Sequence, residues 1–241
     1  MSAFRPVFTR RLAERLQNGH VFNLTAPRGQ GSTRLLHDLA QQMPHAVYLD
    51  LADPTLTPER AWAEAADAGH HSWESILQVW KQADRAPVLL LDHLDRIGNS
   101  EAFGASFFAP LQQMWVSPRL GMLYATEKPL PNIRDDFGWP EGEVVALPPM
   151  GYKRIKEEVL RHFPELKNWT PLATPIFSHP QPYDFLQFVI ERLKGHPDLL
   201  QEPIDHWMPS LIEDFNRLHD LDVQPVRPES GSWWQRLRGR L

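Results

Sequence analysis

The sequence predicts an α/β fold in which helices pack on a mainly parallel sheet, followed by a smaller helical subdomain. Three observations indicate this class. Short apolar runs alternate with helical patterns at least four times before Pro149. One run, PVLLL at 87–91, is apolar throughout, as strands buried on both faces of a parallel sheet are. After Pro149 the strand pattern stops and three amphipathic segments follow.

The elements of the first part can be placed in order. Helices are expected where apolar residues recur three and four positions apart, and strands where a short apolar run is bounded by Gly, Pro or polar residues. The expected helices cover 10–17, 33–43, a segment beginning at 57, 72–83 and 103–115. The expected strands cover 20–24, 46–51, 87–91, 121–125 and 143–147.

The second part contains helical patterns at 152–166, 182–193 and 204–218, with no strong strand among them. A Pro- and Ser-containing stretch, QPVRPESGS, then precedes a basic aromatic tail, WWQRLRGRL. We therefore expect a core at 1–150, a helical subdomain at 151–222, and a linker with a tail at 223–241.

Composition excludes several classes of protein. The 241 residues include no cysteine, so disulfides, thiolate chemistry and cysteine-based zinc sites are excluded. The net charge of −5 gives no general case for a nucleic-acid binder. The N-terminal stretch lacks the apolar core of a signal peptide, and no apolar run is long enough to span a membrane. These features predict a cytoplasmic protein without a membrane partner.

Residues 25–34, TAPRGQGSTR, lie between an expected strand and an expected helix. They resemble the phosphate-binding pattern G-x-x-x-x-G-K-[ST], in which backbone N–H groups and a helix N-terminus converge on an anion. Ser32 stands where the pattern requires lysine, whereas Thr33 keeps the hydroxyl position. The alternative is a glycine-containing turn without a ligand. The candidate nucleotide-binding residues are Arg28, Gly29, Gln30, Gly31, Ser32, Thr33 and Arg34.

A second motif follows the buried strand at 87–91. Asp92 ends this strand, where an acid of the Walker B type orients Mg²⁺. The next position, which holds a water-activating acid in active ATPases, is His93, and Asp95 supplies another carboxylate. Asp92 and Asp95 are therefore the candidate catalytic residues if the chain is an active ATPase, and no catalytic residue is assigned otherwise. The structural alternative is that Asp92 caps the following segment.

Taken together, these motifs resemble the P-loop ATPases of the AAA+/STAND superfamily, in the style of origin-recognition-like and transposition-associated ATPases. Four segments between residues 8 and 220 carry the resemblance: VLLLDHLD, GMLYATEKPL, EVVALPPMGYKRIKEEVL and SHPQPYDFLQFVIERL. The resemblance implies a three-layer P-loop NTPase core with a helical lid. It also implies ATP or ADP with Mg²⁺ held by Thr33 and Asp92, and a sensor-like role for Thr126. A site without any cofactor is an equally open alternative.

The two departures from the family pattern, at Ser32 and His93, both affect phosphoryl transfer. The lysine and the acid normally stabilise charge and position the nucleophile in phosphoryl transfer, and both are replaced here. We therefore expect a degenerate ATPase, a regulatory or structural subunit of a larger assembly that holds ATP without efficient hydrolysis. Two alternatives stay open. One is an active ATPase that uses Arg28 or a neighbouring subunit, and the other is a DNA-associated adaptor in transposition or phage defence.

Two terminal features suggest partners. Trp233, Trp234 and Arg236 in the tail are candidate partner-binding residues, with a frayed chain end as the alternative. A cluster of N-terminal arginines suggests indirect or local nucleic-acid contact, with a solvated helix face as the alternative. The cluster comprises Arg5, Arg10, Arg11 and Arg15.

Overall fold

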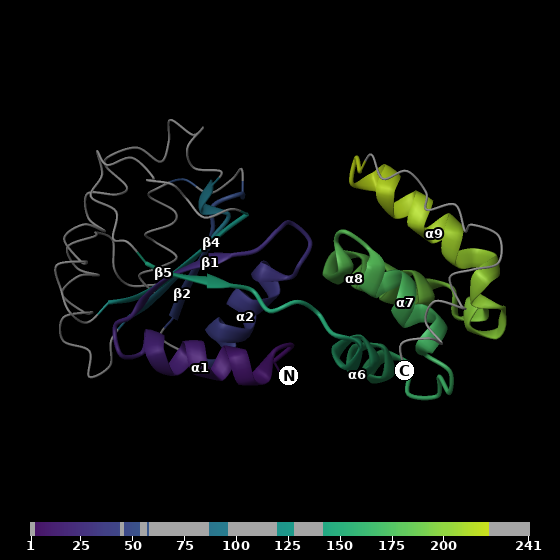
Figure 1. Cartoon of the computed structure of the whole chain (residues 1–241), viewed down its shortest axis with the longest axis horizontal. Coiled ribbons are helices and arrows are strands. Elements are labelled where there is room, and N and C mark those ends of the chain that lie inside the picture. Colours follow the sequence, from purple (N-terminus) through teal and green to yellow (C-terminus); the bar gives the residue numbers. More distant parts are fainter. Residues whose placement is uncertain are drawn as a thin grey trace, which may run out of the picture. The chain divides into compact units, whose positions relative to one another are not determined.

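A computed structural model describes residues 3–43, 46–53, 57, 87–95, 120–127 and 142–221. The chain forms two compact units, shown in Figure 1. The core unit comprises Met1–Arg154 together with Pro180–Asp184, and the helical unit comprises Ile155–His179 and Phe185–Leu241. The helices expected from position 57, at 72–83 and at 103–115, and the tail at 223–241, lie outside the described residues.

The core unit is built on a five-stranded sheet with the strand order β2-β3-β4-β1-β5. Every described strand pair is parallel, which confirms the predicted α/β class. β3 and β4 are buried along their whole length, as central strands of a parallel sheet are. The strands are β1 (Val21–Thr25), β2 (Ala46–Asp50), β3 (Val88–Asp92), β4 (Gly121–Thr126) and β5 (Glu143–Ala146).

Parallel pairing brings the residues that end the strands to one edge of the sheet. Asp50 pairs with Asp92 across β2 and β3, and Thr25 pairs with Thr126 across β1 and β4. Ligands of parallel α/β sheets bind outside these carboxyl ends. The register therefore places the end of β3, the end of β4 and the loop after β1 around the same space.

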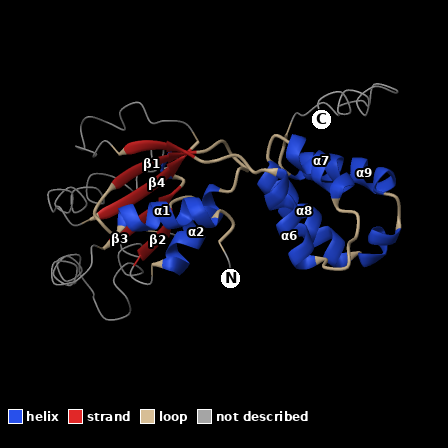
Figure 2. Cartoon of the chain, turned by 60° about the horizontal axis from the view of Figure 1, so that its bottom comes forward, coloured by secondary structure: helices blue, strands red, loops and turns tan. Residues whose placement is uncertain are grey.

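Two helices cover one face of this sheet, α1 (Pro6–Leu16) and α2 (Ser32–Gln42), as Figure 2 shows. Their apolar stripes meet the inward side chains of β1, β3 and β4 in a single core. Burial of each such side chain stabilises the fold by roughly 1.5–3 kcal/mol. The core includes Leu12, Leu16, Phe22, Leu24, Leu35, Leu36, Leu39, Leu90 and Leu123.

An exposed ion pair joins α1 to the edge strand β5. Arg15 donates to both carboxylate oxygens of Glu143, at 3.0 and 2.6 Å, and its guanidinium lies 4.6 Å from the centre of the Phe22 ring. The hydrogen bond from Arg15 lowers the pKa of Glu143. Arg15 is therefore engaged in an ion pair with Glu143, and Arg5 is buried. Of the four arginines in the predicted N-terminal cluster, these two do not form part of an exposed basic surface.

The helical unit packs around a group of aromatic rings. Phe215 on α9 contacts the rings of Phe185 and Phe188 on α8 and of His179, which stacks on Phe185 at 4.5 Å. His179 also lies 3.1 Å from the amide oxygen of the buried Asn216. The elements are α6 (Tyr152–His162), α7 (Thr170–Ser178), α8 (Pro182–Gly195), the 3-10 turn η3 (Pro197–Gln201) and α9 (Ile204–Leu218).

Several expected boundaries differ from the structure. α1 begins at Pro6, four positions before its predicted start, because proline suits the first turn of a helix. α6 ends at His162 rather than at 166, just before Pro164. α7 was not predicted, since it is nine residues long with Pro175 inside it.

Among the described residues, no helix has the length and apolar character needed to cross a membrane.

The packing of α1 on β4 generates a stability prediction. A Cβ at Gly121 would overlap the backbone carbonyl of Leu16, which cannot move without displacing α1. Gly121→Ala should therefore lower the free energy of unfolding by about 1–3 kcal/mol, the usual cost of overpacking. The matched control is Gly151→Ala in the same unit, where an added methyl meets nothing within 4 Å. Equal urea midpoints for the two variants would contradict the packing described.

Candidate nucleotide site

The glycine loop between β1 and α2 has the backbone geometry of an anion-binding turn. Gly29 and Gly31 have φ angles of 77° and 87°, in the left-handed region that favours glycine. Gly31 is the N-cap of α2, and its carbonyl accepts a hydrogen bond from Leu35 N at 3.2 Å. The N–H groups of the first turn of α2, at Ser32 and Thr33, therefore follow the loop directly, as in helix-terminal phosphate sites.

A distant segment of the chain, Pro180–Asp184, packs against this loop inside the core unit. The carbonyl of Gly29 accepts hydrogen bonds from the N–H groups of Tyr183 and Asp184, at 3.0 and 3.4 Å. These residues form the first turn of α8, whose N–H groups have no partners within the helix. The glycine loop thus caps the N-terminus of α8.

The contact leaves no room for side chains on the loop glycines. A Cβ at Gly29 would overlap Gln181, and a Cβ at Gly31 would lie 2.8 Å from the ring of Tyr183. That ring also contacts Phe4 edge to face, with centroids 5.1 Å apart. The glycines are therefore required by close approach as well as by backbone conformation.

The buried guanidinium of Arg5 also holds the loop. It donates to the carbonyl of Gln30 at 2.9 Å and to the carbonyl of Pro148 at 3.1 Å. Burial lowers the pKa of Arg5 to about 10, although the nearby Tyr183 and Asp38 oppose this shift. Arg5 therefore ties the glycine loop to the segment that follows β5.

The other arginine beside the loop, Arg34, is engaged elsewhere. Its Nε donates to the buried carboxylate of Asp38 at 2.9 Å, and that carboxylate also accepts the backbone N–H of Phe4 at 2.6 Å. Burial acts to lower the pKa of Arg34, but the hydrogen bond and charge of Asp38 outweigh it and raise the pKa. Arg34 stabilises the N-terminal segment and does not line the pocket described next.

The loop opens onto a pocket of about 230 Å³ at the carboxyl end of the sheet. The structure brings together here most of the residues singled out from the sequence: Arg28, Gly29, Gly31, Ser32, Thr33, Asp92, Asp95 and Thr126. Gln30 and Arg34, which were predicted with them, do not line it. Trp233, Trp234 and Arg236 lie outside the described residues.

The end of β3 is fixed by a local hydrogen-bond network. Asp92 is buried and accepts hydrogen bonds from Tyr48 Oη at 3.2 Å and from the backbone N–H of His93 at 3.0 Å. Burial, together with the charges of Asp92 and Asp50, raises the pKa of Tyr48, so Tyr48 remains a donor. Asp92 therefore has a fixed orientation at the pocket wall.

His93 directly follows Asp92 and lies beside Asp50 at the end of β2. Its φ is 55°, a left-handed conformation uncommon for a residue other than glycine. Its Nδ1 lies 2.9 Å from a carboxylate oxygen of Asp50 and 3.7 Å from Asp92. The imidazole is thus bound to a strand-end carboxylate, while part of the residue still lines the pocket.

Thr126 contributes its end of β4 to the pocket wall. Its hydroxyl donates to the side-chain oxygen of the buried Asn23 on β1, at 3.4 Å, and its carbonyl accepts the N–H of Ala26 at 3.0 Å. Both bonds join β4 to β1 immediately before the glycine loop. Thr126, the residue predicted as a sensor, is therefore hydrogen-bonded to β1 and to the first residue after it, just before the glycine loop.

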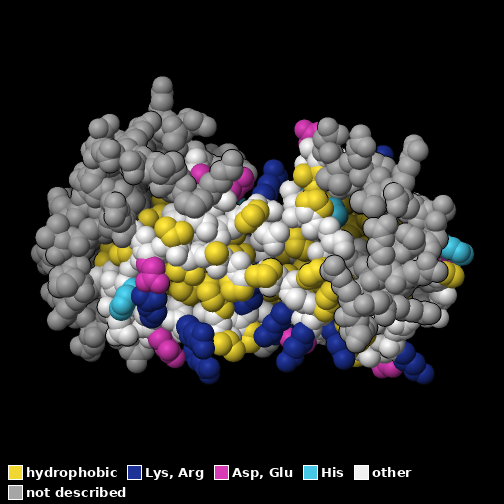
Figure 3. Space-filling view, in the orientation of Figure 1, with side chains coloured by type: hydrophobic (Ala, Val, Ile, Leu, Met, Phe, Trp, Pro, Cys, Tyr) yellow, Lys and Arg dark blue, Asp and Glu magenta, His cyan; other side chains and the backbone are white. Residues whose placement is uncertain are grey.

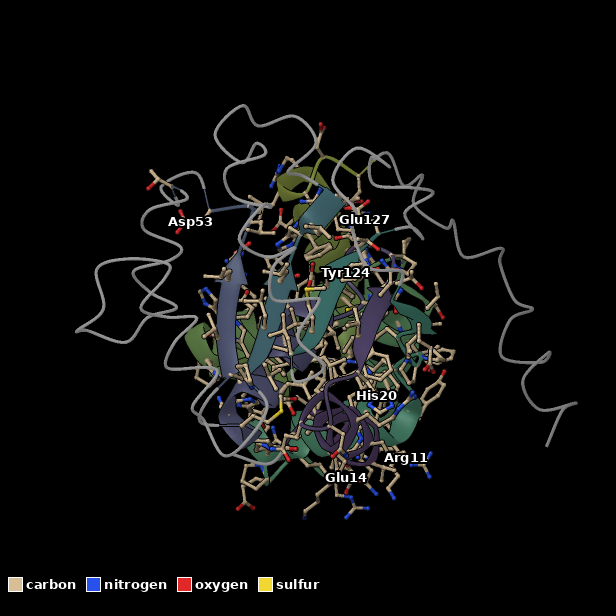
Figure 4. All side chains as sticks on the ribbon, turned by 90° about the vertical axis from the view of Figure 1, so that its left-hand side faces the viewer. Arg11, Glu14, His20, Asp53, Tyr124 and Glu127 are labelled. Carbon is tan, nitrogen blue, oxygen red and sulfur yellow. The ribbon has the colours of Figure 1, made fainter. Side chains whose placement is uncertain are left out.

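The charged side chains around the pocket are mostly acidic. Among its described lining residues, Arg28 is the only lysine or arginine, whereas Asp92, Asp95, Glu127 and Asp184 supply carboxylates. Figure 4 shows Glu127 at the end of the sheet opposite His20, Arg11 and Glu14. In the core unit, Lys and Arg side chains instead gather along the surface where α1 lies, visible in Figure 3. The exposed arginines of α1 therefore do not lie beside the pocket, and they do not place a positive charge near Ser32.

Sequence reasoning missed several residues around the site. Asp50 was detectable in principle, because it ends a strand that neighbours β3 in register. Tyr183 and Asp184 lie about 150 positions from the loop, and no spacing rule links them to it. Glu127 directly follows the predicted sensor position, so its place at the pocket could have been inferred from the end of β4.

Within the described residues, no group of three or more acidic or histidine side chains is arranged to hold a metal ion by itself.

The fit between Gly31 and Tyr183 predicts an energetic coupling. Gly31→Ala forces a left-handed backbone, at about 1–2 kcal/mol, and also drives a methyl into the tyrosine ring. In a Tyr183→Ala background only the backbone cost remains. Urea denaturation of the four proteins of this double-mutant cycle should give a coupling of about 1 kcal/mol. An unchanged cost of Gly31→Ala in the second background would show that the ring does not rest on the loop.

Comparisons with known proteins add to this geometry. No protein-family model and no curated protein matches the sequence. Solved structures do match. The ORC1 protein of Aeropyrum pernix in complex with DNA has a TM-score of 0.63 at 15% identity, over 90% of this chain and 66% of that one. The Walker-type ATPase PABY2304 of Pyrococcus abyssi has a TM-score of 0.62 at 14% identity, over 98% and 75%.

Domain III of the replication initiator DnaA from Thermotoga maritima also matches, with a TM-score of 0.57 at 14% identity over 89% of this chain and 93% of that domain. The chain spans 59% of a further match, a DNA replication initiation factor, and 66% of ORC1, so it corresponds to part of those proteins. These similarities, the parallel sheet and the glycine loop between β1 and α2 lead to one conclusion. The chain has the fold of the AAA+ P-loop ATPases.

Proposed function

We propose that this chain is a degenerate AAA+ ATPase domain, which holds a nucleotide without hydrolysing it efficiently and serves as a regulatory or structural subunit of a larger assembly. The observation that carries the proposal is the composition of the pocket. It combines the glycine loop and Asp92 with a single guanidinium, and it has no lysine among its described lining residues. Solved matches include DnaA bound to AMPPCP, an ATP analogue, which makes a nucleotide the natural ligand to test.

The backbone of the loop supports binding. The left-handed glycines and the N-terminus of the 11-residue helix α2 provide oriented N–H groups, which attract phosphate oxygens without a charged side chain. Thr33 and Asp92 offer a hydroxyl and a carboxylate, the oxygen ligands that Mg²⁺ prefers. A Mg²⁺ ion there would offset part of the negative charge that a triphosphate adds to an acidic pocket.

The side chains argue against turnover. Phosphoryl transfer depends on positive charge at the transferred group and on a group that positions the attacking water. Ser32 supplies no charge, Arg34 is paired with Asp38, and Arg5 is bound to backbone carbonyls. His93 is held by Asp50. Among the described residues near the loop, Arg28 is therefore the one guanidinium that lines the pocket, and the other basic groups named here are engaged elsewhere.

The connections of the loop support the proposal of a regulatory or structural role. Gly29 caps α8, and α8 continues from the core unit into the helical unit. Nucleotide bound at the loop would change the environment of the N-terminal turn of this helix. A domain can thus report nucleotide occupancy to a protein partner without consuming the nucleotide.

Two alternatives remain distinct from this proposal. Arg28 is exposed and lines the pocket, so it is the residue through which an active ATPase would work. Matched structures include ORC1 and DnaA bound to DNA, and Arg10 and Arg11 are exposed on α1, which keeps a DNA-associated adaptor open. Salt-sensitive DNA binding lost on neutralising these two arginines would favour that adaptor.

The first test is steady-state ATP turnover by the purified chain. We expect a rate at least about a hundredfold below the ~1 s⁻¹ that is typical of slow enzymes. Ser32→Lys should not restore turnover, because position 93 still lacks an acid, whereas Ser32→Lys combined with His93→Glu should raise it. Asp92→Ala controls for contaminating ATPases. Robust turnover by the unmodified protein that Asp92→Ala abolishes would establish the active alternative instead.

The second test concerns the acidic pocket. Replacing one lining carboxylate should strengthen Mg²⁺-ATP binding, because like charges repel across a few ångströms of water. Glu127→Gln should raise the affinity about two- to fivefold at low salt, and less at high salt. Glu14→Gln is the matched control, since it removes the same charge at the opposite end of the sheet (Figure 4). Calorimetric titrations that give equal affinities for both variants would contradict an electrostatic effect of the pocket.

A further inference from the structure

The helical unit contains a groove that the nucleotide site does not use. Its volume is about 720 Å³, within the ~300–1,000 Å³ range of ligand sites. One wall is the segment between α6 and α7, and the other is formed by the end of η3 and the start of α9; Figure 2 labels the three helices. Its apolar lining residues are Phe163, Pro164, Leu166, Pro171, Leu200, Pro203 and Ile204.

Acidic side chains stand around this apolar lining. Glu165, Glu202 and Asp205 line the groove, against a single lysine, Lys167, among the described lining residues. All three carboxylate residues are exposed. A ligand that suits this groove therefore has apolar bulk at its centre and positive charge beside it.

We propose that the groove binds the tail of the same chain, residues 233–241 (WWQRLRGRL). The tail has the chemistry that the groove requires. Trp233 and Trp234 each bring roughly 150–250 Å² of largely apolar surface. Arg236, Arg238 and Arg240 supply three positive charges within five residues. This inference is independent of the proposed nucleotide function.

The chain between the helical unit and the tail is long enough for this contact. α9 begins at the groove and ends at Leu218, about 21 Å away along its axis. The described helical unit ends at Leu221, and the twelve residues 222–233 extend up to about 40 Å. The tail can therefore return along α9 to the groove, at the millimolar effective concentration that a short linker provides.

Disulfide trapping tests the contact in the full chain, because the natural sequence contains no cysteine. One protein carries Asn168→Cys in the groove and Gln235→Cys in the tail. The matched control carries Glu213→Cys and Gln235→Cys. Glu213 is exposed on α9 and lies closer along that helix to the start of the linker than the groove does. A tail without a docking site should therefore form the disulfide with the cysteine at position 213 at least as fast as with the cysteine at position 168.

The docked tail predicts the opposite order of rates. The groove pair should form an intrachain disulfide about fivefold faster or more than the control pair. Trp233→Ala with Trp234→Ala should reduce the groove rate to the control rate. Equal rates for the two pairs, a groove rate that is insensitive to the tryptophans, or disulfides formed only between chains would each overturn the proposal; the last outcome would assign the groove to a second copy.

A charge exchange provides a second readout. Glu165→Lys with Glu202→Lys, both at exposed positions, should slow the groove disulfide several-fold. Adding Arg236→Glu and Arg238→Glu to that protein should restore the rate, since the charges are again opposite. Failure of the second pair to restore trapping, with unchanged helical circular dichroism, would contradict recognition of the arginines by the acidic rim.

Discussion

The bond between the carbonyl of Gly29 and the first turn of α8 is the constraint on which the site depends. It fixes the glycine loop from a segment about 150 residues away, and it excludes side chains at Gly29 and Gly31 through Gln181 and Tyr183. The same loop is also held by the buried Arg5, which donates to the carbonyl of Gln30. A phosphate-binding turn is normally kept open toward its ligand by its own glycines. Here its geometry also depends on packing contacts from two remote parts of the chain.

Electrostatics distinguishes this pocket from the motif it resembles. Oriented N–H groups at a helix N-terminus are retained, so the attraction for an anion is present. The charged side chains nearby have been redirected: Arg34 binds Asp38, and His93 binds Asp50. The bond between His93 and Asp50 joins the end of β3 to β2. Arg34 and Asp38 lie one turn apart on α2, and Asp38 also accepts the backbone N–H of Phe4. Arg34 and His93 therefore each have a carboxylate partner within the core unit.

Much of the architecture could be predicted from the sequence. Unbroken apolar runs identified the central strands, and the AAA+ style of fold inferred from motif order is confirmed. The pocket residues after β1 and β3 were found from the phosphate-loop and Walker B patterns, and Thr126 from the family resemblance, and the parallel register brings them to one edge. Local patterns could not reveal Tyr183, Asp184 or Arg5, because their contacts depend on tertiary packing. α7 was missed because its proline and short length conceal helical spacing. The STAND relationship, the degenerate site and the role of Thr126 stay predictions.

The fate of bound nucleotide tests the central claim most directly. The purified protein would be mixed with Mg²⁺ and ATP labelled in the base, separated from free nucleotide by rapid filtration, and denatured at intervals so that the released nucleotide can be identified. A domain that holds ATP without efficient hydrolysis should yield stoichiometric label that is recovered as ATP over hours. Recovery as ADP within minutes would contradict the loss of turnover, and absence of retained label at saturating ATP would contradict nucleotide binding itself.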